Sequence, residues 1–260
     1  MSEYAWIPVA GFIVTFYCAW GGGANDCANS FSSTVGSGAI TLRGAVMIAA
    51  VFEMAGVLLM GSHVASTVRK NIIDIDMFLD DPADLMFGMF CAILSAGIWL
   101  MVSTYLKWAV STTHTIIGSI LGFGIAAQGW DAVKWSGVGK IVASWVLSPG
   151  ISGILSAIFF LIIRNCILRK KEGAAERLIK FYPTLIVVSM VIYSLFIVYK
   201  GSPQLKLNKT PILLAVGISV GIGLFCALLS QLFYVPYLRK RLKRFRATHQ
   251  DMYKVKDDAE

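Results

Sequence analysis

The sequence predicts an all-α membrane protein that crosses the bilayer several times, and three observations support this fold class. Of its 260 residues, 57% are hydrophobic and only 15% are charged, whereas soluble globular domains usually contain about 25% charged residues. Several apolar stretches reach the roughly 20 residues that a helix needs to cross the hydrocarbon core. In addition, the basic residues gather directly after apolar stretches instead of spreading along the chain.

The hydropathy pattern predicts about seven membrane segments. They lie at residues 4–20, 44–61, 85–106, 110–128, 141–168, 178–199 and 211–235. A very short connection separates the segments at 85–106 and 110–128, so this pair forms either two full crossings or a re-entrant hairpin. The segment at 141–168 is long for one span and contains Pro149, so we expect a tilt or a kink there.

Two clusters of basic residues predict the orientation of the chain in the membrane. Six of the 23 Lys and Arg lie between Arg164 and Lys180, and six more lie between Arg239 and Arg246. Cytoplasmic loops carry an excess of Lys and Arg, and two predicted crossings separate the clusters. We therefore expect a plasma-membrane protein with an external N-terminus and a cytoplasmic C-terminus. The net charge of +8 then reflects topology and contact with the lipid bilayer, and we expect no nucleic-acid partner.

The most informative motif follows the first apolar segment. Three consecutive glycines, 21–23, precede Asn25, Asp26 and Asn29. Each glycine costs about 1 kcal/mol in a helix relative to alanine, so we expect the helix to break at this point. In transporters, broken helices surround ions with freed carbonyls and polar side chains. The oxygen atoms of Asn25, Asp26 and Asn29 therefore predict a Na⁺ site, with a helix-capping role for Asp26 as the alternative.

A second motif places three consecutive hydroxyls, Ser111, Thr112 and Thr113, between two apolar segments. Hydroxyl groups together with exposed helix N–H groups can replace the hydration shell of an oxyanion. Hydroxyls inside membranes also bond to carbonyls of their own helix, so this motif alone does not define a site. At predicted membrane depth the acidic residues are Asp26 and Glu53, and an intramembrane carboxylate is a functional candidate because its insertion costs ~2.5–3.5 kcal/mol.

Several segments together resemble one known family. They are 23–30, 34–38, 52–53, 69–74, 110–114 and 140–149, and they occur in the order in which the family's recurrent motifs do. This family is the inorganic phosphate transporter (Pit) family, the sodium-dependent phosphate symporters. Cys27, the pair Ser32–Ser33 and Ala109 depart from its usual residues, although the polar groups of both motifs are present.

The resemblance implies secondary active transport of inorganic phosphate, with Na⁺ as the coupling ion and no cofactor. Asp26 and the hydroxyls of residues 111–113 would contact phosphate, while Asn25, Asp26 and Asn29 would hold sodium. Proton coupling stays open as an alternative. We do not expect an enzyme, because no catalytic spacing or metal cluster accompanies the motifs.

The family contains two related repeats of inverted orientation, and this sequence contains one copy of the motif pair, so it resembles the N-terminal repeat. We expect the repeat with its signature motifs at 1–165, a basic cytoplasmic loop at 166–180, two further transmembrane helices at 181–238 and a basic cytoplasmic tail at 239–260. A half-transporter needs a homodimer or a second repeat half to complete it. Alternatively, it serves as a partner, regulator or receptor subunit, or the sequence is a fragment.

Overall fold

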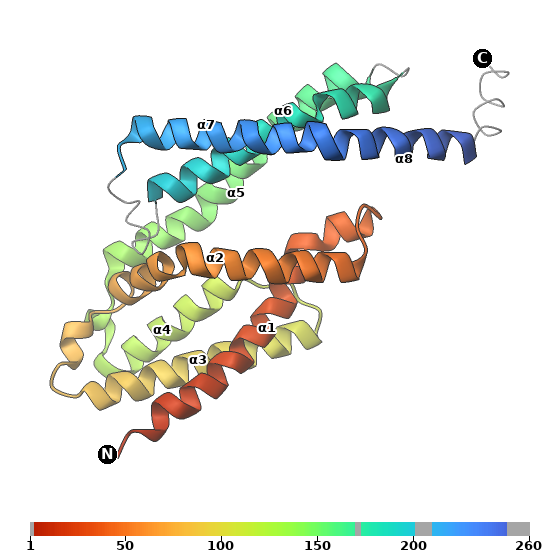
Figure 1. The fold of residues 1–260 in the computed structure, drawn as a ribbon. Helices are drawn as coiled ribbons and strands as arrows, with labels where there is room; N and C mark the ends of the chain where they lie inside the picture. Colours follow the sequence, from red (N-terminus) through yellow and green to blue (C-terminus); the bar gives the residue numbers. More distant parts are fainter. Residues whose placement is uncertain (1–2, 170–172, 201–209, 249–260) are drawn as a thin grey trace. The chain divides into compact units, whose positions relative to one another are not determined.

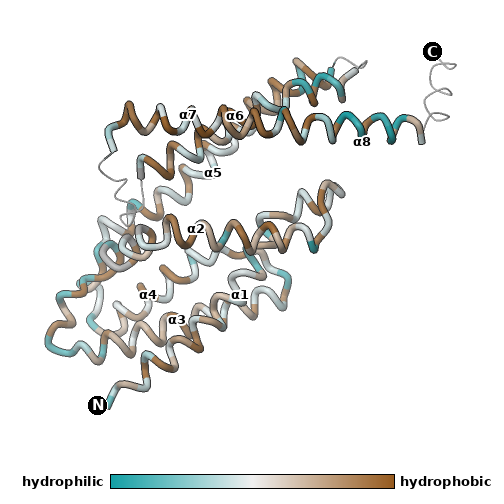
Figure 2. The backbone as a smooth tube through the Cα atoms, in the orientation of Figure 1, coloured by the Kyte–Doolittle hydropathy of each residue, from teal (hydrophilic) through white to brown (hydrophobic). Residues whose placement is uncertain are grey.

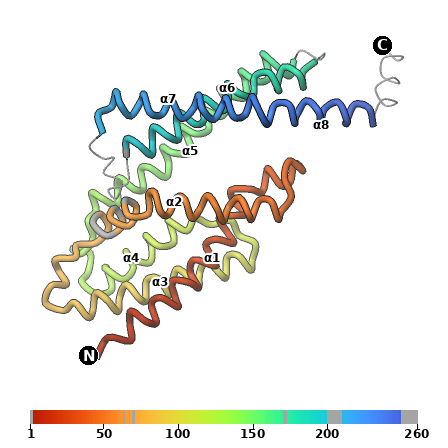
Figure 3. The backbone as a smooth tube through the Cα atoms, in the orientation of Figure 1, coloured from red at the N-terminus to blue at the C-terminus, as the bar shows by residue number. Residues whose placement is uncertain are grey.

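A computed structural model describes residues 3–169, 173–200 and 210–248, and all regular structure within them is helical. The chain divides into two compact units, Met1–Val146 and Leu147–Glu260, so the boundary falls inside one long helix. Each unit is an antiparallel arrangement of long helices, as the ribbon and the tube show (Figures 1 and 3).

Unit 1 contains four helices and the first part of a fifth. These are α1 (Trp6–Gly36), α2 (Leu42–Asn71), α3 (Pro82–Tyr105), α4 (Thr112–Gln128) and the start of α5 (Trp135–Ile163), with the short 3₁₀ turns η1 (Ile75–Phe78) and η2 (Trp130–Ala132) in the connections. The helices α3 and α4 pack together as a hairpin, and α1 packs along α3. The core of this unit gathers around buried residues of α3, α4 and the connections, among them Leu100, Ile117 and Phe78.

Unit 2 contains the rest of α5 and two further long helices. The π-helical turn η3 (Arg164–Leu168) extends α5, and α6 (Ala174–Lys200) follows. A second π-helical turn, η6 (Ser230–Tyr234), joins α7 (Ile212–Leu229) to α8 (Val235–Thr248). The principal contact in this unit is between α6 and α7, where Gly223 lies against α6: a Cβ atom there would be 2.7 Å from a methyl group of Val191.

Six helical stretches among the described residues are long and apolar enough to cross a membrane, which confirms a multi-pass helical membrane protein. Large apolar side chains point outward from them, such as Phe12 at 79% exposed and Leu213 at 83%, as expected of a lipid-facing surface. Figure 2 shows this apolar character along most of α7. The predicted segment at 110–128 is not among these six. It corresponds to α4, whose 17 residues span only about 25 Å, less than the roughly 30 Å of a hydrocarbon core.

The predicted helix break at the three glycines is wrong, because α1 continues through them to Gly36. Gly21 and Gly22 are buried instead: a Cβ atom on Gly21 would lie 3.1 Å from Met101 Sδ, and one on Gly22 would lie 3.3 Å from Thr112 Oγ1. Close packing of α3 and α4 against this surface offsets the low helix propensity of glycine. Asp26 lies in the middle of α1, so the alternative of a helix cap is wrong as well.

The break lies instead between α3 and α4, at residues 106–111. Lys107 adopts φ +62° in this connection, a left-handed conformation that non-glycine residues rarely adopt. The N–H of Trp108 then donates to Ser103 O at 2.8 Å. The chain reverses direction within a few residues, which brings the start of α4 beside α1.

Several helices are longer than the sequence predicts. The helix α2 continues to Asn71, and much of the predicted loop at 166–180 is helical, since η3 ends at Leu168 and α6 begins at Ala174. Arginine and lysine are good helix formers, so the helices continue beyond their apolar stretches. Pro149 lies inside α5 without ending the helix.

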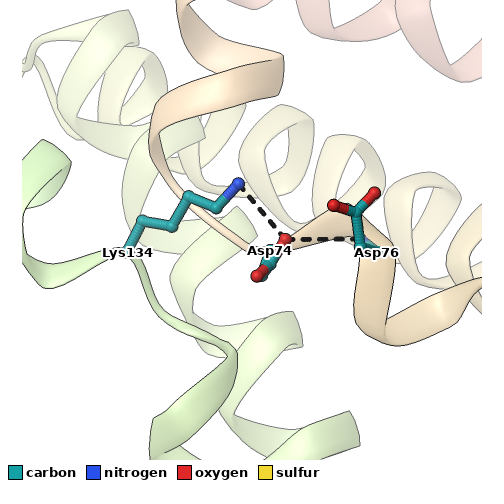
Figure 4. Close-up of polar contacts among 3 residues, drawn as sticks. All are labelled: Asp74, Asp76 and Lys134. Atoms are coloured by element: carbon teal, nitrogen blue, oxygen red, sulfur yellow. Dashed lines mark hydrogen bonds and ion pairs between the residues drawn. The ribbon is translucent and has the colours of Figure 1, made fainter.

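At the other end of the α3–α4 hairpin, the connection between α2 and α3 contacts the connection between α4 and α5. Ile73 and Val133 form an isolated antiparallel bridge, and next to it Lys134 Nζ lies 3.2 Å from Asp74 Oδ1. The same carboxylate oxygen accepts the N–H of Asp76 at 3.3 Å (Figure 4). This end of unit 1 is therefore closed by a backbone bridge, an ion pair and a capped 3₁₀ turn.

Candidate functional site

Asn25 connects α1 to the loop between α3 and α4. Its side chain is 5% exposed, and its Nδ2 donates to Trp108 O at 2.9 Å and to Thr104 Oγ1 at 3.4 Å. Its Oδ1 accepts the backbone N–H of Val110 at 3.1 Å. One buried amide therefore satisfies backbone groups that the chain reversal leaves without helical partners.

Asn29 lies one helical turn further along α1 and extends this network. Its Nδ2 donates to Asn25 Oδ1 at 3.1 Å and to Val110 O at 3.1 Å. The spacing of four residues predicts that the two asparagines share a helix face, and the structure confirms it. Both acceptor positions of Asn25 Oδ1 are occupied, whereas Asn29 is exposed.

Asp26 contacts the first residue of α4. Thr112 Oγ1 donates to Asp26 Oδ2 at 2.8 Å, so the carboxylate of the first motif meets one hydroxyl of the second. Ser111 is the N-cap of α4, and its Oγ accepts the N–H of His114 at 3.3 Å. The first N–H groups of a helix have no partner within the helix, and the helix dipole is positive at this end. The arrangement is therefore suited to an anion.

A cavity of about 400 Å³ opens beside this contact. At about 30 Å³ per water molecule, it has room for roughly a dozen waters, or for a small oxyanion with accompanying cations. It is lined by Thr15, Cys18, Ala19, Gly22, Gly23, Asp26, Cys27, Ser30, Phe31, Ala49, Glu53, Ile93, Thr112 and Ile116. Asp26 and Glu53 are its ionisable carboxylates, and none of the described lining residues is Lys, Arg or His.

The structure brings part of the predicted site together. Asp26, Thr112 and Glu53 line one cavity, while Asn25 and Asn29 lie beside it in the hydrogen-bond network. Ser111 and Thr113 are outside the cavity lining; Ser111 caps α4, and Thr113 is exposed without a side-chain hydrogen bond among the described residues.

Sequence reasoning missed two kinds of participant. The first is Thr104, which accepts from Asn25 and donates to Leu100 O at 2.8 Å. The second is the backbone of Trp108 and Val110, which holds both asparagines. Backbone groups have no sequence signature, but a serine or threonine close to the end of a membrane helix was a signal for Thr104. Cavity-lining hydroxyls at Thr15 and Ser30 could have been found by their helical spacing from Asp26.

Comparison with known proteins is consistent with these features. A profile described as "Phosphate transporter family" matches residues 22–260. Sodium-dependent phosphate transporter 1 of Mus musculus is 38% identical over 92% of this chain, which corresponds to 35% of the mouse protein. Sodium-dependent phosphate transporter 2 of Felis catus is 37% identical over 100% of the chain and 39% of its own length.

A solved structure agrees with the sequence relatives. The structure titled "The sodium-dependent phosphate transporter" matches with a TM-score of 0.77 and 31% identity, over 90% of this chain and 55% of its own. The chain thus spans between 35% and 39% of the length of these curated relatives. Because the family profile and the relatives cover nearly the whole chain, the chain belongs to the phosphate transporter family.

Proposed function

We propose that this chain takes part in sodium:phosphate symport, with the cavity beside Asp26 as the substrate site. The observation that carries the proposal is the 2.8 Å hydrogen bond from Thr112 to Asp26 at the wall of a cavity whose ionisable groups are acidic. A phosphate ion entering such a cavity adds negative charge to two carboxylates at membrane depth. Coulomb repulsion in a medium of low dielectric constant is strong, so cations must accompany the anion.

For phosphate, we propose Thr112, the hydroxyls of Ser111 and Thr113 and the N–H groups at the start of α4. These donors point from a positive helix end, which favours an oxyanion. Ser111 and Thr113 lie outside the cavity lining, so they reach phosphate only if it binds at the helix end or if the side chains rotate. Thr112 has one O–H, which donates to Asp26, so it donates to phosphate only after that bond opens. Asp26 would then contact phosphate through a shared cation or by accepting a hydrogen bond from a P–OH group, which phosphate carries near neutral pH.

For sodium, we propose Asp26, Asn25 and Asn29. Asp26 supplies the charge, and the oxygen atoms of Asn29 and Asp26 that make no hydrogen bond to described residues are available as ligands. Asn25 Oδ1 already accepts two hydrogen bonds, so its coordination of sodium requires one of them to open. Glu53 faces the same cavity from α2 and is the residue through which proton coupling would act as the alternative.

We propose that a second repeat half, or a second copy of the chain, completes the transporter. All the described site residues belong to α1, α2, α3, α4 and the connection between α3 and α4, within the single repeat that we expect at 1–165. A role as a partner, regulator or receptor subunit would use the same fold without transport. Phosphate uptake, measured for the chain with and without a partner half, distinguishes the two roles, because only the transporter role predicts uptake when the partner half is present.

Sodium dependence is the test of the proposed function. In proteoliposomes that contain the chain and a partner half, an inward sodium gradient should raise the initial rate of radiolabelled phosphate uptake at least about tenfold over choline, because cations must balance phosphate and two carboxylates. Protein-free liposomes provide the background. Equal uptake in sodium and choline between pH 6 and pH 8 would refute sodium coupling, and a response to pH alone would establish proton coupling.

We also propose an external N-terminus and a cytoplasmic position for both basic clusters in the plasma membrane. A single cysteine at position 169, in a background without other cysteines, should resist a membrane-impermeant thiol reagent in intact cells and react after permeabilisation. A cysteine placed at exposed Asp80, in the α2–α3 connection, is the matched external control and should react in both conditions. Labelling of position 169 in intact cells would overturn the proposed orientation.

A further inference from the structure

The last helix of unit 2 changes abruptly from apolar to strongly basic. Through η6, α7 continues into α8, and the hydropathy of the tube changes where α8 begins (Figure 2). Six basic residues lie between Arg239 and Arg246, and the sequence has no acidic residue among them. Preference for the cytoplasmic side explains a basic cluster at this position, but it does not explain how the charges are arranged on the helix.

The apolar side chains of α8 are used within its own unit. Val235, Leu238 and Leu242 recur at the spacing of one helix face; Val235 is 1% exposed and the two leucines are half-buried. The helix α8 packs against α6, and an ion pair from Arg246 to Glu176 near the start of α6 joins the two helices further. The protein itself therefore fixes the orientation of α8 about its axis.

A contiguous basic face of α8 runs from beside this apolar stripe to the far side of the helix. It carries Arg239, Lys240, Lys243 and Arg244, and all four are exposed. None of their side chains makes an ion pair or a hydrogen bond with a described residue. Like charges four positions apart destabilise a helix, and this face contains two such pairs, 239 with 243 and 240 with 244. The face therefore gains stability from an external anion.

Three tyrosines show where this face lies relative to the membrane. The rings of Tyr182 and Tyr234 are 5.3 Å apart, and those of Tyr234 and Tyr237 are 6.0 Å apart. Tyrosine is enriched at the boundary between hydrocarbon and headgroups. With a rise of 1.5 Å per residue, the charges from 239 to 244 lie about 3 to 11 Å beyond Tyr237 along the helix axis. With the tyrosines at that boundary and the helix along the membrane normal, these charges reach the headgroup layer.

We propose that this basic face of α8, defined as Arg239, Lys240, Lys243 and Arg244, binds the headgroups of anionic phospholipids. The partner is a lipid because the face lies at headgroup depth, directly after an aromatic cluster, on a helix that leaves the bilayer at this point. An anionic membrane surface attracts nearby basic residues, and salt screens the attraction. Four such residues on one fixed face favour anionic over zwitterionic lipid.

The test is lipid binding to the purified full chain in neutral detergent, measured by native mass spectrometry. The wild type should bind phosphatidylserine at least about tenfold more tightly than phosphatidylcholine, and added NaCl should weaken this preference. The variant R239Q/K240Q/K243Q/R244Q should bind the two lipids within about twofold of each other. Detergent solution removes the effect that the same substitutions have on membrane orientation.

A charge-preserving variant, R239K/K240R/K243R/R244K, is the matched control and should keep the preference. Circular dichroism and size-exclusion chromatography show whether each variant is folded, and the salt dependence of the wild type tests the proposal without any variant. A preference that survives in the glutamine variant or that ignores salt would overturn the proposal. Binding of inositol hexakisphosphate without any preference for phosphatidylserine would assign the face to a soluble polyanion and would overturn it too.

Discussion

Asp26→Asn is expected to reduce sodium-driven phosphate uptake at least about 100-fold, equivalent to about 2.7 kcal/mol, while the abundance of the chain in the membrane stays near that of the wild type. The substitution preserves side-chain volume and an acceptor for the Thr112 hydroxyl, which now donates to Asp26 Oδ2 at 2.8 Å. It removes the negative charge that the proposed sodium site requires. The substitution therefore tests the charge of Asp26 while keeping its side-chain volume and its hydrogen bond from Thr112.

Initial rates of uptake in proteoliposomes with a partner half measure this effect, and surface biotinylation measures abundance. Asp131→Asn is the matched control, because Asp131 is an exposed aspartate in η2 that does not line the cavity, and uptake by this variant should stay near that of the wild type. Uptake by Asp26→Asn at the wild-type rate would eliminate Asp26 as a sodium ligand. Loss of the protein from the membrane would instead show that Asp26 serves folding.

Asn25→Ala is expected to lower both thermal stability and uptake. Asn25 is buried and serves both the carbonyl of Trp108 and the N–H of Val110. Truncation leaves these two groups unsatisfied, and each unsatisfied buried group costs about 1–3 kcal/mol, so the destabilisation should total roughly 2–6 kcal/mol. The melting temperature of the purified chain in detergent measures stability, and the uptake assay measures function.

Asn29→Ala provides a graded comparison for Asn25. Asn29 is exposed and only donates, to Val110 O and to Asn25 Oδ1, so its loss should lower the melting temperature much less. Asn25→Asp keeps the acceptor for Val110 but loses the donor to Trp108 and buries a carboxylate beside Asp26, so it should melt at least as low as Asn25→Ala. If Asn25→Ala had the same melting temperature as the wild type, the stability of the loop between α3 and α4 would not depend on this amide.

The apolar segments could be predicted because they depend on composition alone. The ends of the helices could not be predicted in this way. The helix α2 continues to Asn71 and α6 begins at Ala174, because packing and helix propensity extend these helices beyond their apolar stretches. The glycine run misled for a related reason. Propensity counts what glycine costs an isolated helix, whereas Gly21 and Gly22 contact side chains that lie about eighty residues further along the chain, and such contacts are not visible in a local pattern.

The site was predicted at the level of residue types and only partly at the level of contacts. The resemblance to the phosphate transporter family implied that Asp26 and Thr112 contact the same ion, and the structure places the two side chains within hydrogen-bond distance. The asparagines were expected to be ligands, yet their amides hold the backbone of residues 108–110, which depends on the chain reversal at Lys107. A left-handed lysine has no sequence signature, so this part of the network had to come from the structure.

The fastened end of unit 1 has a mechanical consequence for the helical hairpin above it. The bridge between Ile73 and Val133 and the ion pair of Asp74 with Lys134 hold one end of the α3–α4 hairpin in place. Any movement of the hairpin would therefore pivot about this end. A small tilt at the base produces its largest displacement at the tip, residues 106–111. Thr112 follows directly after this tip, and the amides of α1 hold the tip, so those hydrogen bonds, together with the packing of α1 along α3, would oppose movement of the proposed phosphate donors away from Asp26.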